Sequence, residues 1–189
     1  MIPQAPKKSI ALSRASSRQW VLKPQDLAVA LKLVTLKGRW LPYAALGETL
    51  RLSRFEAHAA VQRLTAAGLV AEIEGPPQVI FAALRLFVVF GARYAYPPVR
   101  GGLTIGVPTA QALPVVRRLI SAPDEQAIVW PHRDGRVRGQ SLLPLYESLP
   151  LAAQEAPAFH ELLALFDLLR IGQARERALA QRLLERRLS

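Results

Sequence analysis

Residues 42–70 carry the pattern that most restricts how this chain can fold, because two short helical periodicities follow each other across a two-residue break. In the first, Leu46 and Leu50 lie four residues apart, which places both on one face of a helix. Arg51-Leu52 forms the break, with Leu52 pointing back into the core. A second helix runs to about residue 67, and its buried face holds apolar residues at helical spacing: Ala57, Ala60, Val61 and Leu64.

Start and stop signals support the second helix. Ser53 is a good N-cap, because its hydroxyl can accept from a free backbone N–H group. Glu56 stands three residues later and completes an S-x-x-E capping box. Gly68 suits the left-handed position that ends a helix. Small side chains at Gly47 and Ala57 allow the two helices to cross closely.

This arrangement predicts a helix-turn-helix, whose second helix enters the major groove of DNA. Arg pairs with guanine, Gln with adenine, and an exposed Phe contacts the thymine methyl group. The expected base-contacting residues are Arg54, Phe55, His58, Ala59 and Gln62. The expected phosphate-contacting residues beside them are Tyr43, Arg51, Ser53 and Arg63. The alternative is an αα-hairpin inside a helical core, with a solvated outer face.

The segments LKPQDLAVALKLV, YAALGETL, LSRFEAHAAVQRL and AAGLV resemble the winged helix-turn-helix of MarR-type bacterial transcription regulators. The closing stretch Arg63 to Val70 is typical of that superfamily. Arg51 stands where a glycine is common, so we expect a non-glycine residue near positive φ. The wing is less evident, since AEIEGPP offers one short strand before a turn. The resemblance implies a bacterial regulator that dimerises through its terminal helices.

Charge is unevenly distributed in this chain of net charge +11. Residues 1–40 sum to +7, residues 41–75 to −1, residues 76–120 to +5, and residues 121–189 to zero. The expected helix-turn-helix is therefore not basic, and attraction to the phosphate backbone must come from other parts of the chain. The N-terminal arm, residues 1–21, is one source, because its basic residues could follow phosphates or enter a minor groove: Lys7, Lys8, Arg14 and Arg18. A solubilising tail is the alternative.

Beyond the arm, we expect a winged helix-turn-helix domain over 22–92, with a first helix from Pro24 to about Leu36. The apolar run after Gly75-Pro76-Pro77 predicts a buried helix over 78–92, too short to span a bilayer. Glycine and proline favour an ordered extended loop over 93–114 within the region 93–139. Residues 127–137 predict a hairpin turning at Asp134-Gly135. Arginines crowd its tip, which is either a wing-like DNA contact or a surface turn: Arg133, Arg136 and Arg138.

Residues 140–189 form a helical C-terminal region. Its apolar stripes suit either a partner subunit or the chain's own core. Leu162, Leu165, Phe166 and Leu169 form one stripe, and a second begins near Ala174. The fold class is thus mainly α: a winged helix-turn-helix domain with a small β-hairpin and additional C-terminal helices.

We expect a cytoplasmic repressor, acting as a homodimer on double-stranded DNA without cofactor or membrane. The chain has no cysteine, and His58, His132 and His160 are isolated, so no catalytic or metal-binding residues are predicted. The alternative function is an antitoxin-like or accessory subunit whose C-terminal half binds another protein.

Overall fold

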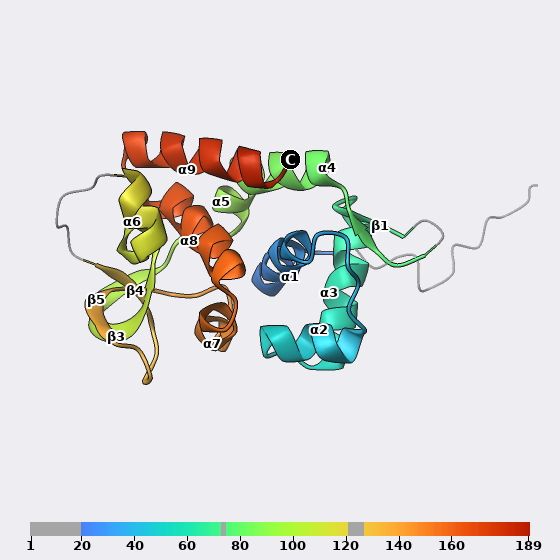
Figure 1. Ribbon diagram of the computed structural model, residues 1–189, viewed down its shortest axis with the longest axis horizontal. Helices are drawn as coiled ribbons and strands as arrows, with labels where there is room; N and C mark the ends of the chain where they lie inside the picture. Colours follow the sequence, from blue (N-terminus) through green and yellow to red (C-terminus); the bar gives the residue numbers. More distant parts are fainter. Residues whose placement is uncertain (1–19, 73–74, 121–126) are drawn as a thin grey trace, which may run out of the picture.

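The computed structural model describes residues 20–72, 75–120 and 127–189 of the chain. The four basic residues assigned to the N-terminal arm lie outside these ranges. The described part is mainly helical, with one two-stranded and one three-stranded sheet (Figure 1). None of its helices is both long and apolar enough to cross a bilayer.

Three helices and a small sheet make up the N-terminal unit: α1 (Pro24–Thr35), α2 (Tyr43–Leu50), α3 (Arg54–Ala66), β1 (Val70–Ala71) and β2 (Gln78–Val79). The expected periodicities are confirmed, because Leu46, Leu50 and the apolar face of α3 are at most 1% exposed. Gly68 ends α3 with φ +70°, as its position after the last apolar residue predicts.

The strands β1 and β2 correct the expected start of the fourth helix. Val70 pairs with Val79 and Ala71 with Gln78 in an antiparallel sheet. Gln78 and Val79 therefore form a second strand, whereas the sequence predicted only one strand in this region. The following helix, α4 (Phe81–Leu86), begins only at Phe81.

Helix α4 continues as a π-helical segment, η1 (Phe87–Gly91), and a last turn, α5 (Ala92–Ala95). The prediction of a buried helix holds for one side only. Leu84 and Val88 are fully buried, whereas Leu86, Phe90 and Tyr94 are 60%, 55% and 74% exposed. We call these three residues, four apart along the chain, the apolar stripe.

Three strands form a small closed barrel: β3 (Arg100–Thr109), β4 (Ile128–Pro131) and β5 (Val137–Leu142). The stretch expected as an extended loop is thus partly a ten-residue strand, followed by a short 3₁₀ turn, η2 (Ala110–Ala112), and α6 (Pro114–Ile120). The turn at Asp134-Gly135 is present, since the Gly135 N–H donates to the His132 carbonyl at 3.0 Å.

The expected hairpin pairing of β4 with β5 is wrong. Both strands pair antiparallel with β3 and run parallel to each other. Gly106 explains this arrangement, because it faces Pro131 of β4 and Val137 of β5 at once. A Cβ atom on Gly106 would lie 2.0 Å from the Trp130 carbonyl oxygen, so only glycine permits this approach.

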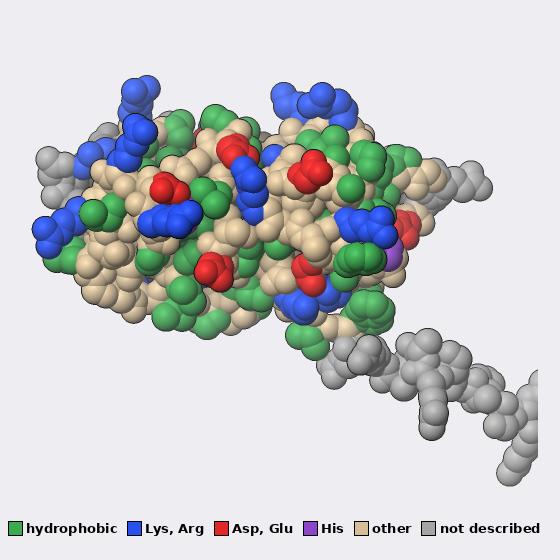
Figure 2. Space-filling model, turned by 90° about the horizontal axis from the view of Figure 1, so that it is seen from below, with side chains coloured by type: hydrophobic (Ala, Val, Ile, Leu, Met, Phe, Trp, Pro, Cys, Tyr) green, Lys and Arg blue, Asp and Glu red, His purple; other side chains and the backbone are tan. Residues whose placement is uncertain are grey.

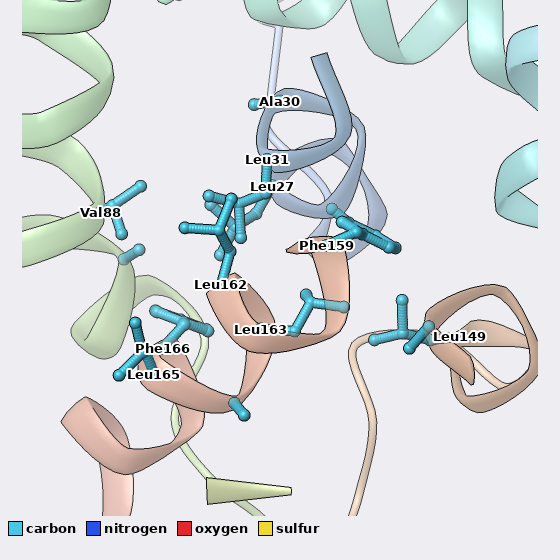
Figure 3. Close-up of a cluster of buried hydrophobic side chains, with 14 of the residues drawn as sticks. Leu27, Ala30, Leu31, Val88, Leu149, Phe159, Leu162, Leu163, Leu165 and Phe166 are labelled. Atoms are coloured by element: carbon cyan, nitrogen blue, oxygen red, sulfur yellow. The ribbon is translucent and has the colours of Figure 1, made fainter. Parts of the chain in front are cut away.

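The C-terminal region contains α7 (Leu149–Gln154), α8 (Pro157–Ile171) and α9 (Ala174–Arg187). Helix α8 is buried on almost every side, which identifies it as the central helix of the core. In Figure 3 its Phe159 and Leu162 meet Leu27 and Leu31 of α1, with Val88 of η1 beside them. One hydrophobic cluster therefore crosses the boundaries expected at residues 92 and 139.

The first C-terminal stripe expected to suit a partner subunit is occupied within the chain, because Leu162, Leu165, Phe166 and Leu169 of α8 are at most 3% exposed. The second expected stripe is only partly buried. Its Leu183 and Leu188 are buried, Leu179 is half-buried, and Ala174 and Ala178 are exposed. The α8 stripe therefore packs on the chain's own core, and the α9 stripe does so in its second half.

A buried polar cluster joins α8 to the barrel. The Asp167 carboxylate is 2% exposed and accepts hydrogen bonds from Thr109 Oγ1 at 2.7 Å and Trp130 Nε1 at 2.8 Å. It also pairs with Arg170, whose Nη1 donates to the Tyr96 carbonyl at 3.2 Å. Each of these groups would be costly to bury alone, so the cluster fixes how the barrel sits on α8.

Candidate nucleic-acid interface

The turn between α2 and α3 is tight and held by the backbone. Arg51 adopts φ 55° and ψ 35°, so the expected left-handed conformation of a non-glycine residue is confirmed. The Leu52 N–H donates to the Gly47 carbonyl at 2.9 Å. A Cβ atom on Gly47 would lie 2.7 Å from the Leu52 carbonyl oxygen, so glycine is needed where the turn folds back. This geometry fixes the direction in which α3 leaves the turn.

Half of the expected capping box is present at the start of α3. The Ser53 hydroxyl accepts from the Glu56 N–H at 3.1 Å. The Glu56 carboxylate does not complete the box, because it accepts from Gln25 of α1 at 3.0 Å and pairs with Arg63 at 2.5 Å. Glu56 thus ties α3 to α1 instead of capping the Ser53 N–H group.

The outer face of α3 presents Arg54, Phe55 and His58 to solvent. The Phe55 ring is 71% exposed, and the Arg54 guanidinium lies 4.6 Å from its centroid. Ala59 and Gln62 are half-buried farther along the same side. The core lies on the opposite face of the helix, so the Phe55 ring is accessible from solvent.

Tyr43 borders this face from α2. Its ring makes edge contacts with His58, at a centroid distance of 4.7 Å, and with Trp40, at 5.2 Å. Burial raises the pKa of Tyr43, so the hydroxyl keeps its proton and remains able to donate a hydrogen bond. The contact with Tyr43 also limits the orientations open to His58.

Arg63 does not fit the expected phosphate contact. It is 8% exposed, and its Nε and one Nη each donate at 2.7 Å to the carboxylate of Asp26, which is fully buried. Glu56 pairs with the same guanidinium. These hydrogen bonds, chiefly the one to Asp26, raise the pKa of Arg63. Arg63 fixes α3 against α1 and is removed from the set of expected surface contacts.

Residues far along the chain support the α2–α3 turn, and sequence reasoning missed them. The Tyr146 hydroxyl donates to the Leu50 carbonyl at 2.8 Å, and the Ser148 hydroxyl donates to the Arg51 carbonyl at 3.1 Å. Arg51 also pairs with Glu155 at the end of α7. No local spacing indicates these contacts, because about a hundred residues separate the partners.

Figure 2 shows the lower side of the molecule. Lys and Arg side chains occur at both ends of this side, with Asp and Glu interspersed among them. At the end that holds α2 and α3, basic, hydrophobic and His side chains lie next to one another. The surface is therefore chemically mixed and not a continuous basic track, in keeping with the sum of −1 for residues 41–75.

Replacing Arg51 with glycine is expected to stabilise the fold slightly. A left-handed conformation costs a non-glycine residue on the order of 1 kcal/mol. The ion pair that is lost, with Glu155, is solvent-exposed and contributes little. Urea unfolding of Arg51→Gly should show a free energy of unfolding higher by up to about 1 kcal/mol. The matched variant Arg51→Ala, which keeps the strain, should not gain stability; an equal gain in both would contradict the explanation.

Comparison of the chain with protein-family models, curated proteins and solved structures finds no match.

Proposed function

We propose that this protein is a sequence-specific double-stranded DNA-binding regulator of transcription that acts as a repressor. In this proposal α1–α3 form a helix-turn-helix and β1–β2 its wing. The observation that carries the proposal is the outer face of α3, where Arg54, Phe55 and His58 are exposed beside a tight, rigidly supported turn.

Each group on this face has a fitting role. Arg54 would donate to a guanine edge, Gln62 would pair with adenine, and Phe55 would contact a thymine methyl group. His58 and Ala59 lie between them on the helix. Tyr43, Arg51 and Ser53 would contact phosphates and set the register of the helix in the groove. The supports from Tyr146 and Ser148 favour this use, because a reading helix must be held in one orientation.

Loss of the base-reading side chains is expected to reduce sequence discrimination. A gel-shift titration would compare duplex DNA from upstream of the chain's own coding sequence with a scrambled duplex, at two salt concentrations. Arg54→Ala and Gln62→Ala should each weaken specific binding by roughly 1–3 kcal/mol and leave non-specific binding nearly unchanged. Arg182→Ala, on the exposed side of α9, is the matched control. If both α3 variants keep the wild-type preference, α3 does not read the sequence.

In this proposal the regulator is a homodimer, and the exposed apolar stripe of Leu86, Phe90 and Tyr94 is its contact surface. The resemblance implies a dimer, and the expected stripe on α8 is already buried within the chain. Sedimentation equilibrium should give twice the chain mass of 20.8 kDa for the wild type. Phe90→Ser should give the single-chain mass. A monomeric wild type would refute the dimer.

A further inference from the structure

The turn between β4 and β5 carries a basic surface that the proposed role of α3 does not explain. Arg133, Arg136 and Arg138 are all exposed, and the side chain of Arg133 is 91% exposed. Arg136 directly precedes β5 and Arg138 is the second residue of that strand, and both are exposed to solvent. Asp134 is the only acidic residue in the sequence from 127 to 146. We call these three arginines the arginine turn.

The arginine turn is rigid. The His132 N–H donates to the Ile105 carbonyl at 3.3 Å, and the Asp134 N–H donates to His132 Nδ1 at 3.2 Å. Gly135 packs directly on Gly106, since a Cβ atom on Gly135 would lie 2.3 Å from the Gly106 Cα atom. A backbone that is already rigid loses little conformational entropy when the arginines on it bind a ligand.

The arginine turn lies on the same side of the molecule as the start of α3. Figure 1 shows the β4–β5 turn at the lower edge of the molecule, where α2 also lies. Helix α3 begins four residues after α2 ends, so Arg54 lies on this side too. A DNA duplex that lies along this side would therefore contact α3 near one end of the molecule and the arginine turn near the other.

We propose that the arginine turn binds backbone phosphates of the same DNA duplex that α3 reads, beyond one end of the base-contacting region. This inference rests on the proposed function. Arginine suits the task, because its planar guanidinium donates to two phosphate oxygens at once. The arginine turn also supplies electrostatic attraction to the DNA backbone. Residues 41–75 cannot supply it, because their net charge is −1. The arginine turn contributes affinity and not sequence preference.

The salt dependence of binding tests the proposal. The variant Arg133→Ala/Arg136→Ala/Arg138→Ala is compared with Arg175→Ala/Arg182→Ala/Arg186→Ala, which removes the same charge from exposed positions on α9. Helix α9 lies along the opposite edge in Figure 1. Each lost phosphate contact should lower the slope of log affinity against log salt by roughly 0.9. We expect the first variant to lose about two to three in slope, to bind roughly ten- to a hundredfold more weakly, and to keep the wild-type discrimination between duplexes.

Directed cleavage locates the contact. The chain has no cysteine, so Asp134→Cys, Glu48→Cys and Arg182→Cys each carry a single iron-chelate label. Glu48 is exposed on α2, six residues before Arg54. The labels at 48 and 134 should cut the duplex at separate places, and the label at 182 should not cut it. Cutting from 48 alone, with a wild-type salt slope in the triple-arginine variant, overturns this inference and leaves the proposed function standing.

Two further outcomes also decide the proposal. A turn variant that binds DNA normally but no longer binds polyglutamate assigns the surface to an acidic protein and overturns the inference. A wild type that binds no duplex at low salt overturns the proposed function and this inference together.

Discussion

Removing the carboxylate of Asp26 is expected to destabilise the protein by about 3–5 kcal/mol, because the change strands a buried cation. Asp26 is fully buried and Arg63 is 8% exposed, and two hydrogen bonds of 2.7 Å join them. Asp26 also accepts from the Lys23 N–H at 2.8 Å, which caps α1. In Asp26→Ala, Arg63 keeps only Glu56, whose side chain is partly exposed. Urea unfolding monitored by circular dichroism measures the loss.

The double variant Asp26→Leu/Arg63→Met is the matched control. Replacing both charges with apolar groups of similar size removes the desolvation cost along with the attraction, and such exchanges are often neutral or stabilising. We therefore expect the double variant to recover most of the stability that Asp26→Ala loses. A double variant as unstable as the single one would show that the stranded charge is not the cause.

Asp167→Ala is expected to have a comparable effect, about 3–5 kcal/mol, at the junction of α8 and the barrel. The change leaves Arg170 buried without its carboxylate and removes the acceptor for Thr109 and Trp130. Buried polar groups without partners each add to the loss. Because Trp130 is itself a donor in the cluster, tryptophan fluorescence should change together with the free energy of unfolding.

Glu161→Ala on the same helix is the control for Asp167→Ala. Glu161 pairs with Arg187, whose side chain is 36% exposed, so solvent screens the interaction. This variant should lose no more than about 1 kcal/mol. Equal losses at positions 161 and 167 would show that burial of the Asp167 cluster does not govern its contribution.

Local features were predicted well, because their causes lie within a few residues. The apolar spacing of α2 and α3, the Ser53 cap, the left-handed Arg51 and the end of α3 at Gly68 follow from short-range sterics and hydrogen bonding. The mainly helical character of the described chain follows in the same way. The outer face of α3 is the complement of its buried face, so the exposure of Phe55 and His58 could also be predicted.

Features set by distant partners could not be predicted. Arg63 lies at the edge of the apolar face of α3, and Asp26, 37 residues earlier, determines its burial. The antiparallel hairpin expected for β4 and β5 was wrong because β3 pairs antiparallel with both strands, which leaves them parallel to each other. Gln78 and Val79 continue into an apolar run, and only their pairing with β1 makes them a strand. In each case the deciding contact is tertiary.

The hydroxyl groups of Tyr146 and Ser148 bind the carbonyl groups of Leu50 and Arg51, and this pairing bears on how the protein can change over evolution. A segment ending near residue 92 would carry the whole N-terminal unit, yet the α2–α3 turn would lose its outer supports. Its α1 would also lose the cover of Phe159 and Leu162. Gene fusion or domain exchange at that point would transfer an incomplete fold. The N-terminal unit is therefore not a transferable cassette, and the chain is expected to be inherited and lost as one piece.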